Sequence, residues 1–327
     1  MTKETNFPTL CVKGTSIPSA FYRAMEEVWN KGLSVRTEYD RRDANGEYID
    51  PAGKDARVLI EVTNPFAEPR FPAISFCEIG PYIAEIMGVK DHLVVPMEDL
   101  KEAIGGELSA TQWPYTYHQR LFAHPDLNGD VINQVELALD RVARTPYTRR
   151  AVMDTAVPNL DPYLKEDVPC LRELQLRALE GEDGELHLNM NAMWRSRDLY
   201  KAWADNVVAI TFLQREFARR LEEKTGRKIN VGSYAEFSGS LHIYGQDFST
   251  VGGDSERGLK SFFDNFRTEE EFLARCMTSE DARDLLIIPQ LRGLLSEEGR
   301  RQWRFPQSSV DLLENLVMDF EEGKYTP

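Results

Sequence analysis

Two spacings of apolar residues alternate along the chain, and together they indicate a protein that mixes helices with strands. Apolar positions on one helical face predict helices over residues 20–32, 131–145 and 198–224, the last one ending at Gly226. Alternation with more polar neighbours predicts a half-buried strand through Leu186, Leu188, Met190, Ala192 and Trp194. Further strands are expected over 56–62, 149–153, 166–179 and 229–245, and an acidic, helical region from about 265. This order predicts an α+β fold.

Composition limits the classes of protein that fit this pattern. With 42% hydrophobic residues and no tandem repeat or long linker, we expect residues 1–327 to form a single domain. No apolar run approaches the roughly 20 residues that span a bilayer, and the first residues lack a secretory signal, so we expect a cytoplasmic protein without a membrane partner. The net charge of −15 disfavours a nucleic-acid partner.

One of the four cysteines differs from the others in its surroundings. Their wide spacing predicts neither a disulfide framework nor a zinc site, and the histidines show no metal-ligand spacing, so no metal is expected. Cys11, Cys77 and Cys276 are interpreted as ordinary apolar residues. Cys170 follows a proline and precedes a strand pattern, and arginines near a thiol would stabilise its nucleophilic thiolate. We therefore interpret Cys170 as a candidate nucleophile, with a core cysteine as the alternative.

Five motifs in order resemble the thymidylate synthase family. They are TPYTRRAVM, PCLRELQ, WRSRD, an asparagine eleven residues after the first arginine of WRSRD, and HIYG, within about residues 113 to 247. The N-terminal third is divergent, and its VTNPFAEPRFP and WPYTYHQRL look closer to bacterial and archaeal members. The resemblance implies a thymidylate synthase-like fold, with a large mixed β-sheet flanked by helices and one sheet face used for homodimerisation.

The resemblance implies catalytic roles for five residues. Cys170 would add to C6 of a pyrimidine nucleoside monophosphate, so that C5 can attack the one-carbon unit of 5,10-methylenetetrahydrofolate. Glu85, with Glu78 as the alternative, would manage water and protons, and Tyr117 would act near the C5 proton. Asn206, with Asp205 as the alternative, would face the edge of the pyrimidine. Asp198 would contact either the pyrimidine ring or the pterin of the folate.

The resemblance also implies substrate-binding residues. Arg195 and Ser196 would hold the nucleotide phosphate, because guanidinium groups match phosphate geometry. Across the dimer, the partner subunit would add Arg149 and Arg150 to the same site. Gln175 would help to organise the nucleotide, whereas His242 and Tyr244, two apart on one strand face, would bind a sugar hydroxyl. Arg36, Arg41 and Arg42 are equivalent candidates for a further phosphate contact.

Departures from the family pattern bear on the product. Leu171 replaces the histidine that usually follows the nucleophile, bulky Trp203 stands in a segment that is usually a Gly- and Pro-containing turn, and the chain ends in EEGKYTP. We expect an altered pocket wall that admits water. The favoured function is therefore a (deoxy)cytidylate or uridylate 5-hydroxymethylase, with methylation of dUMP to dTMP as the alternative.

Other interpretations are weaker, and part of the substrate stays open. A catalytically silent nucleotide-binding homologue is disfavoured because the motif positions are filled. An unrelated thiol enzyme that pairs Cys170 with His242 is disfavoured by the order of the motifs. Asn206 favours uracil, because an ionised aspartate would only accept and would suit the cytosine amino group. The sequence leaves the base and the sugar, ribose or deoxyribose, open.

Overall fold

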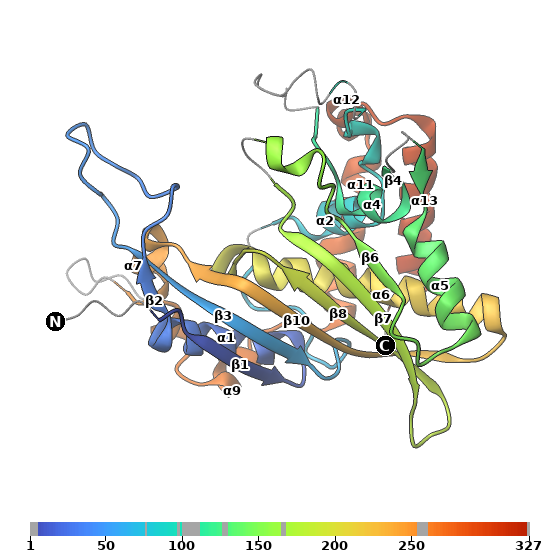
Figure 1. Ribbon diagram of the computed structural model, residues 1–327, viewed down its shortest axis with the longest axis horizontal. Helices are drawn as coiled ribbons and strands as arrows, with labels where there is room; N and C mark the ends of the chain where they lie inside the picture. Colours follow the sequence, from blue (N-terminus) through green and yellow to red (C-terminus); the bar gives the residue numbers. More distant parts are fainter. Residues whose placement is uncertain are drawn as a thin grey trace.

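A large mixed β-sheet forms the centre of the protein (Figure 1). The computed structural model describes residues 6–75, 77–96, 99, 112–125, 130–164, 168–253 and 261–325. The main strand order is β1 (Thr9–Gly14), β3 (Gly53–Val62), β10 (Ile229–Ile243), β8 (Leu186–Trp194), β7 (Leu171–Glu180) and β6 (Val152–Asp154). β2 (Leu33–Val35) pairs with β3, and β9 (Arg197–Asp198) pairs with β10. The β1–β3 and β10–β8 pairs are parallel, as is β9–β10, and the others are antiparallel, so the predicted α+β class is confirmed.

Helices pack against one face of this sheet. In Figure 1, α1 (Ile17–Lys31) and α6 (Ala204–Thr225) lie behind the strands. The side chains that meet these helices are buried, among them Val58 and Ile60 on β3 and Leu188 and Met190 on β8. Further helices are α2 (Ile79–Ile86), α4 (Tyr117–Phe122), α5 (Gln134–Arg144), α7 (Phe248–Val251), α8 (Phe262–Asn265), α9 (Glu269–Leu273), α10 (Ser279–Ala282), α11 (Ile288–Leu295), α12 (Glu297–Trp303) and α13 (Gln307–Glu321). Within the described ranges, no helix is long and apolar enough to cross a membrane.

Capping residues explain where the predicted helices begin. α1 starts earlier than its apolar pattern, because the Ser16 hydroxyl accepts from the Ser19 N–H and Pro18 suits the first turn. α5 starts at Gln134, because Asn133 caps it. The preceding β5 (Val131–Ile132) pairs with β4 (His124–Pro125) instead of extending the helix.

The start of α6 differs most from the sequence prediction. Residues Leu199–Trp203 form a π-helical turn, and the Asp198 carboxylate accepts the Lys201 N–H at 3.0 Å. The regular helix therefore begins only at Ala204, whereas its end at Gly226, with φ +65°, agrees with the prediction.

The opposite face of the sheet carries a row of exposed apolar side chains. Strand register places Cys11 beside Leu59, Leu59 beside Phe237, and Phe237 beside Met193. Leu59, Phe237 and Met193 are 46%, 36% and 47% exposed. We call these four residues the apolar row. No helix of the described chain covers it in Figure 1, and a contiguous exposed apolar surface of this kind is typical of an interaction site.

Candidate active site

Cys170 lies directly before β7, in a loop that Arg195 holds in place. The Arg195 guanidinium donates to the Val168 carbonyl at 2.6 Å and to the Pro169 carbonyl at 3.2 Å. Its backbone N–H donates to the Cys170 carbonyl at 2.9 Å. The structure thus brings the predicted nucleophile and the predicted phosphate arginine together, and it gives the arginine an additional positioning contact that the sequence did not suggest.

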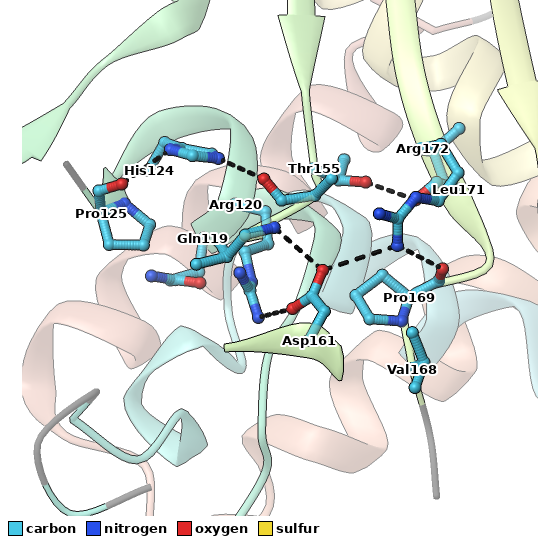
Figure 2. A network of polar contacts seen from close by, with 12 residues as sticks. Gln119, Arg120, His124, Pro125, Thr155, Asp161, Val168, Pro169, Leu171 and Arg172 are labelled. Carbon is cyan, nitrogen blue, oxygen red and sulfur yellow. Dashed lines mark hydrogen bonds and ion pairs between the residues drawn. The ribbon is translucent and has the colours of Figure 1, made fainter. Parts of the chain in front are cut away.

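A buried ion pair supports the same loop from behind (Figure 2). Asp161 accepts from Arg120 at 3.0 Å and forms a second ion pair with Arg172 at 3.5 Å. Arg172 also donates to the Pro169 carbonyl, and the Thr155 hydroxyl donates to the Leu171 carbonyl. Arg120 and Asp161 are almost fully buried, at 2% and 3% exposure. Sequence reasoning missed these residues, because no motif marks a buried pair whose members are 41 residues apart.

Two tyrosines connect Cys170 to the first helical turns of α2 and α6. The Tyr117 hydroxyl accepts the Leu171 N–H at 3.3 Å, and burial, followed by the Cys170 thiol, raises the Tyr117 pKa above its usual value. The Tyr82 hydroxyl accepts from the Asn206 amide at 2.5 Å. Burial raises the Tyr82 pKa as well, with further contributions from Tyr117 and then Glu85. Cys170, Tyr117, Tyr82, Asn206 and Glu85 therefore belong to one cluster.

Of the two glutamate candidates, Glu85 is the one inside this cluster. It is partly buried and pairs with the Lys90 ammonium at 3.2 Å. Lys90 is 5% exposed and lies over the rings of Trp303 and Trp113, 4.5 and 5.3 Å from their centroids. Glu78 is exposed at the start of α2 and makes no capping bond. The geometry therefore favours Glu85.

The neighbouring candidates Asn206 and Asp205 point to different partners. The Asp205 carboxylate is buried and accepts from the Ser75 hydroxyl at 2.8 Å and from the Cys77 N–H at 3.3 Å. Asn206 faces Tyr82 instead. Asp205 thus holds Ser75 and Cys77, which leaves Asn206 as the candidate for the pyrimidine edge.

Strand pairing brings Asp198 and the His242–Tyr244 pair to one place. Asp198 on β9 lies beside His242 on β10, and the two rings of the pair are 4.6 Å apart. We expected both residues on one strand, but β10 ends at Ile243 and Tyr244 follows it. The two rings nevertheless lie in contact. Burial raises the Asp198 pKa to about 6 and lowers the His242 pKa to about 4. The Tyr244 pKa is raised to about 12, mainly by burial and next by the charge of Asp198. Cys170 also contributes, which places it near the His242–Tyr244 pair.

Three predicted residues lie away from Cys170 within the subunit. In the β6–β7 pair Val152 lies opposite Gln175, so the same register places Arg150 opposite Arg177. Arg177 is seven residues after Cys170, which corresponds to about 23 Å along the strand at ~3.3 Å per residue. Arg149 and Arg150 are exposed there. Gln175 donates to the Arg149 carbonyl at 3.1 Å and accepts from Asn191 at 3.2 Å. One subunit therefore does not combine these three residues with its own nucleophile.

The three N-terminal arginines lie on a loop that projects from the sheet (Figure 1). Arg41 forms an ion pair with Asp50 at 2.6 Å, whereas Arg36 and Arg42 lie over the Tyr48 ring at 3.9 and 3.8 Å. Each has a local partner, so the structure does not single out one of them for phosphate binding.

The departures at Leu171 and Trp203 do not change the pocket wall directly. Both side chains are fully buried. Trp203 donates its indole N–H to Glu236 at 2.8 Å and accepts the Arg197 guanidinium on its carbonyl at 3.0 Å. The π-helical turn directs Trp203 into the core, so its side chain is not exposed to a pocket in this structure. Within the described residues, no group of histidine, cysteine or carboxylate side chains is arranged to hold a metal.

Comparison with known proteins identifies the family. A model of the thymidylate synthase family matches residues 96–266, about half of the chain. This chain belongs to the thymidylate synthase family. Membership confirms the thymidylate synthase-like fold, with its large mixed β-sheet flanked by helices, and makes the protein a transferase of one-carbon groups.

Relatives in methanogenic archaea bear the name putative thymidylate synthase. The Methanocaldococcus jannaschii protein is 27% identical over 251 residues, covering 74% of this chain and 94% of the relative. The Methanosarcina mazei protein is 27% identical over 242 residues, covering 73% and 92%. The Methanothermobacter marburgensis protein is 34% identical over 134 residues, covering 41% and 52%. These values agree with a divergent family member.

Proposed function

We propose that this thymidylate synthase family member transfers a one-carbon unit to C5 of a pyrimidine nucleoside monophosphate. The observation that carries the proposal is the placement of Cys170 in a cluster with Tyr117, Arg195 and Tyr244. The thiolate would attack C6, and the electron pair of the C5–C6 double bond would make C5 nucleophilic. Tyr117 would take up the C5 proton as the folate amine leaves the new methylene group, and the Cys170 thiolate would leave C6 in the last step, when the ring regains its double bond.

The remaining cluster residues would orient the nucleotide. Asn206 would contact the pyrimidine edge, and Glu85 would order water near the ring carbonyl. Arg195 and Ser196 would bind phosphate, with Gln175 organising the nucleotide at the subunit boundary. His242 and Tyr244 would bind a sugar hydroxyl.

The one-carbon donor in this proposal is 5,10-methylenetetrahydrofolate. Its pterin carries N–H donors, and the carboxylate of Asp198 is an acceptor held near Tyr244 and the nucleophile. Asp198 would bind and orient these donors while its other contact, to the Lys201 N–H, keeps the carboxylate in place.

For the product we favour the 5-hydroxymethyl nucleotide, with the 5-methyl nucleotide as the second candidate. The same methylene-substituted pyrimidine can accept hydroxide from water or a hydride from tetrahydrofolate. Support for hydroxymethylation comes from two departures from the family pattern, the altered residue after the nucleophile and the altered segment 199–205. The name thymidylate synthase, which the archaeal relatives carry, favours methylation.

The product assay separates the two candidates. The protein is incubated with dUMP, dCMP, UMP or CMP and methylenetetrahydrofolate, and the nucleotides are analysed by mass spectrometry. Formation of dihydrofolate, followed by ultraviolet absorbance, accompanies methylation and not hydroxymethylation. Cys170→Ser should abolish turnover and retain nucleotide binding, because an alcohol is a far weaker nucleophile than a thiolate. Wild-type turnover by this variant would overturn the mechanism.

We also propose a homodimer with active sites shared between subunits. The exposed apolar row provides a surface to bury, and Arg149 and Arg150 are too far from their own Cys170 to share its ligand. Mixing Arg150→Ala chains with Cys170→Ser chains should restore activity, because one hybrid site keeps both residues. No recovery after proven subunit exchange would contradict the shared site.

A further inference from the structure

A chain of three polar side chains runs from β3 to His242. The Ser240 hydroxyl donates to Asp55 at 2.8 Å, and its oxygen lies 3.3 Å from Nδ1 of His242. Asp55 is the register partner of His242 across the antiparallel β3–β10 pair. Ser240 stands in an irregularity of this pairing, between Ser238 and Leu241, where a β-bulge redirects a side chain.

The direction of these hydrogen bonds determines which ring nitrogen carries the proton. A serine hydroxyl has one hydrogen, and here it points to the Asp55 carboxylate, which when ionised can only accept. The Ser240 oxygen must therefore accept from Nδ1–H of His242. The Ser240 backbone also bonds the ring and raises its pKa, which is the effect of a carbonyl that accepts a ring N–H. Both contacts favour the tautomer with the proton on Nδ1.

The other ring nitrogen is left as a buried acceptor. His242 is only 8% exposed, and Nε2 has no hydrogen-bond partner among the described residues. Burial lowers the ring pKa to about 4, against a smaller opposing effect of Glu38, so the ring is neutral near pH 8. A buried acceptor without a protein partner is rare in folded proteins, and the hydroxyl of a ligand is a donor that would satisfy it, as is a water molecule.

We propose that Asp55 and Ser240 are positioning residues that set the tautomer of His242, so that Nε2 accepts a hydrogen bond from a sugar hydroxyl of the substrate. The inference rests on the proposed nucleotide-binding function and deepens it. According to this inference, the site requires a sugar hydroxyl on the substrate that donates a hydrogen bond to Nε2. Neither Asp55 nor Ser240 would touch the substrate, because both act through the imidazole.

The tautomer is measured directly in the ligand-free protein. Nitrogen-15 spectra of histidine-labelled protein at pH 8, above the Asp55 pKa of about 6, should show His242 protonated at Nδ1, with the signal assigned by its loss in His242→Gln. Asp55→Asn and Ser240→Ala should shift the population towards Nε2–H, whereas Ser240→Thr, which keeps the hydroxyl, should not. A wild-type ring protonated at Nε2, or no shift in both folded variants, would overturn the proposal.

Kinetics then test the hydroxyl. Asp55→Asn and Ser240→Ala should raise KM for the hydroxylated nucleotide about tenfold, which is the value of one lost hydrogen bond, with kcat nearly unchanged. They should leave the KM of the 2′,3′-dideoxy nucleotide unchanged. Equal losses with both nucleotides would indicate a merely structural role and overturn the proposal. If the wild type binds no nucleotide, the proposed function and the ligand assignment fail together, while the spectra still decide the tautomer.

Discussion

Replacing Glu236 by glutamine tests the buried ion pair beneath the Arg195–Asp198 segment. The Glu236 carboxylate is 1% exposed and accepts from Arg197 at 2.5 Å. It also accepts from the Tyr234 hydroxyl at 2.7 Å, the Trp203 indole at 2.8 Å and the Ser238 hydroxyl at 3.1 Å. Four donors thus converge on one carboxylate that joins β10, β9 and the π-helical turn.

The expected cost follows from what glutamine leaves behind. The amide keeps the shape, but it removes the negative charge and places an N–H₂ group against donors. Arg197 then remains buried at 3% exposure without its counter-ion, and its Nε already has no partner among the described residues. Removing one member of a buried ion pair destabilises a protein by about 3–5 kcal/mol. Replacing both members should cost less, so Arg197→Met should partly rescue Glu236→Gln.

Urea unfolding of the two single variants and the double variant measures this coupling. The protein concentration is held constant, because the stability of the proposed dimer would depend on it. The double variant should be at least about 1 kcal/mol more stable than the sum of the single losses predicts. A loss below about 1 kcal/mol in Glu236→Gln, or additive losses in the cycle, would refute the reasoning.

Two further predictions concern residues nearer the substrate. Asn206→Asp should raise the ratio of kcat/KM for cytosine over uracil nucleotides roughly tenfold, because a carboxylate has no donor for the uracil O4; an unchanged ratio in the folded variant would exclude base reading by Asn206. Asp198→Asn should stabilise the protein on the order of 2 kcal/mol above pH 6, because the folded-state pKa of about 6 exceeds the usual 3.8 and the ionised carboxylate is disfavoured there. Well below pH 3.8 both states are protonated and the gain should vanish; a gain that urea unfolding finds independent of pH would contradict this origin.

The elements predicted from the sequence are those whose apolar pattern is strong. β8 was expected from its alternation, and the structure buries Leu186, Leu188 and Met190 on one side. The end of α6 was expected from Gly226. The ordered motifs likewise implied a shared site for Cys170 and Arg195, and in the structure Cys170 directly precedes β7 and Arg195 directly follows β8.

Other parts of the site depend on tertiary contacts that a pattern does not encode. Arg120 and Asp161 resemble ordinary surface residues in the sequence, and only the fold buries them as a pair. The sequence pattern does not show the π-helical turn that directs the Trp203 indole to Glu236. The pairing of Asp55 with Ser240 required the β3–β10 register and its bulge, which link residues 185 positions apart.

Charge gives a physical reason for the proposed sharing of the site between two subunits. The phosphate of the proposed substrate is an anion, whereas the chain has a net charge of −15, so binding it would require local cations. Arg195 is near Cys170, but its guanidinium already donates to the Val168 and Pro169 carbonyls. Arg149 and Arg150 are exposed on the β6 edge, far from their own nucleophile. A second subunit docked on the apolar row would bring such arginines towards the phosphate, so dimerisation would add both burial and charge.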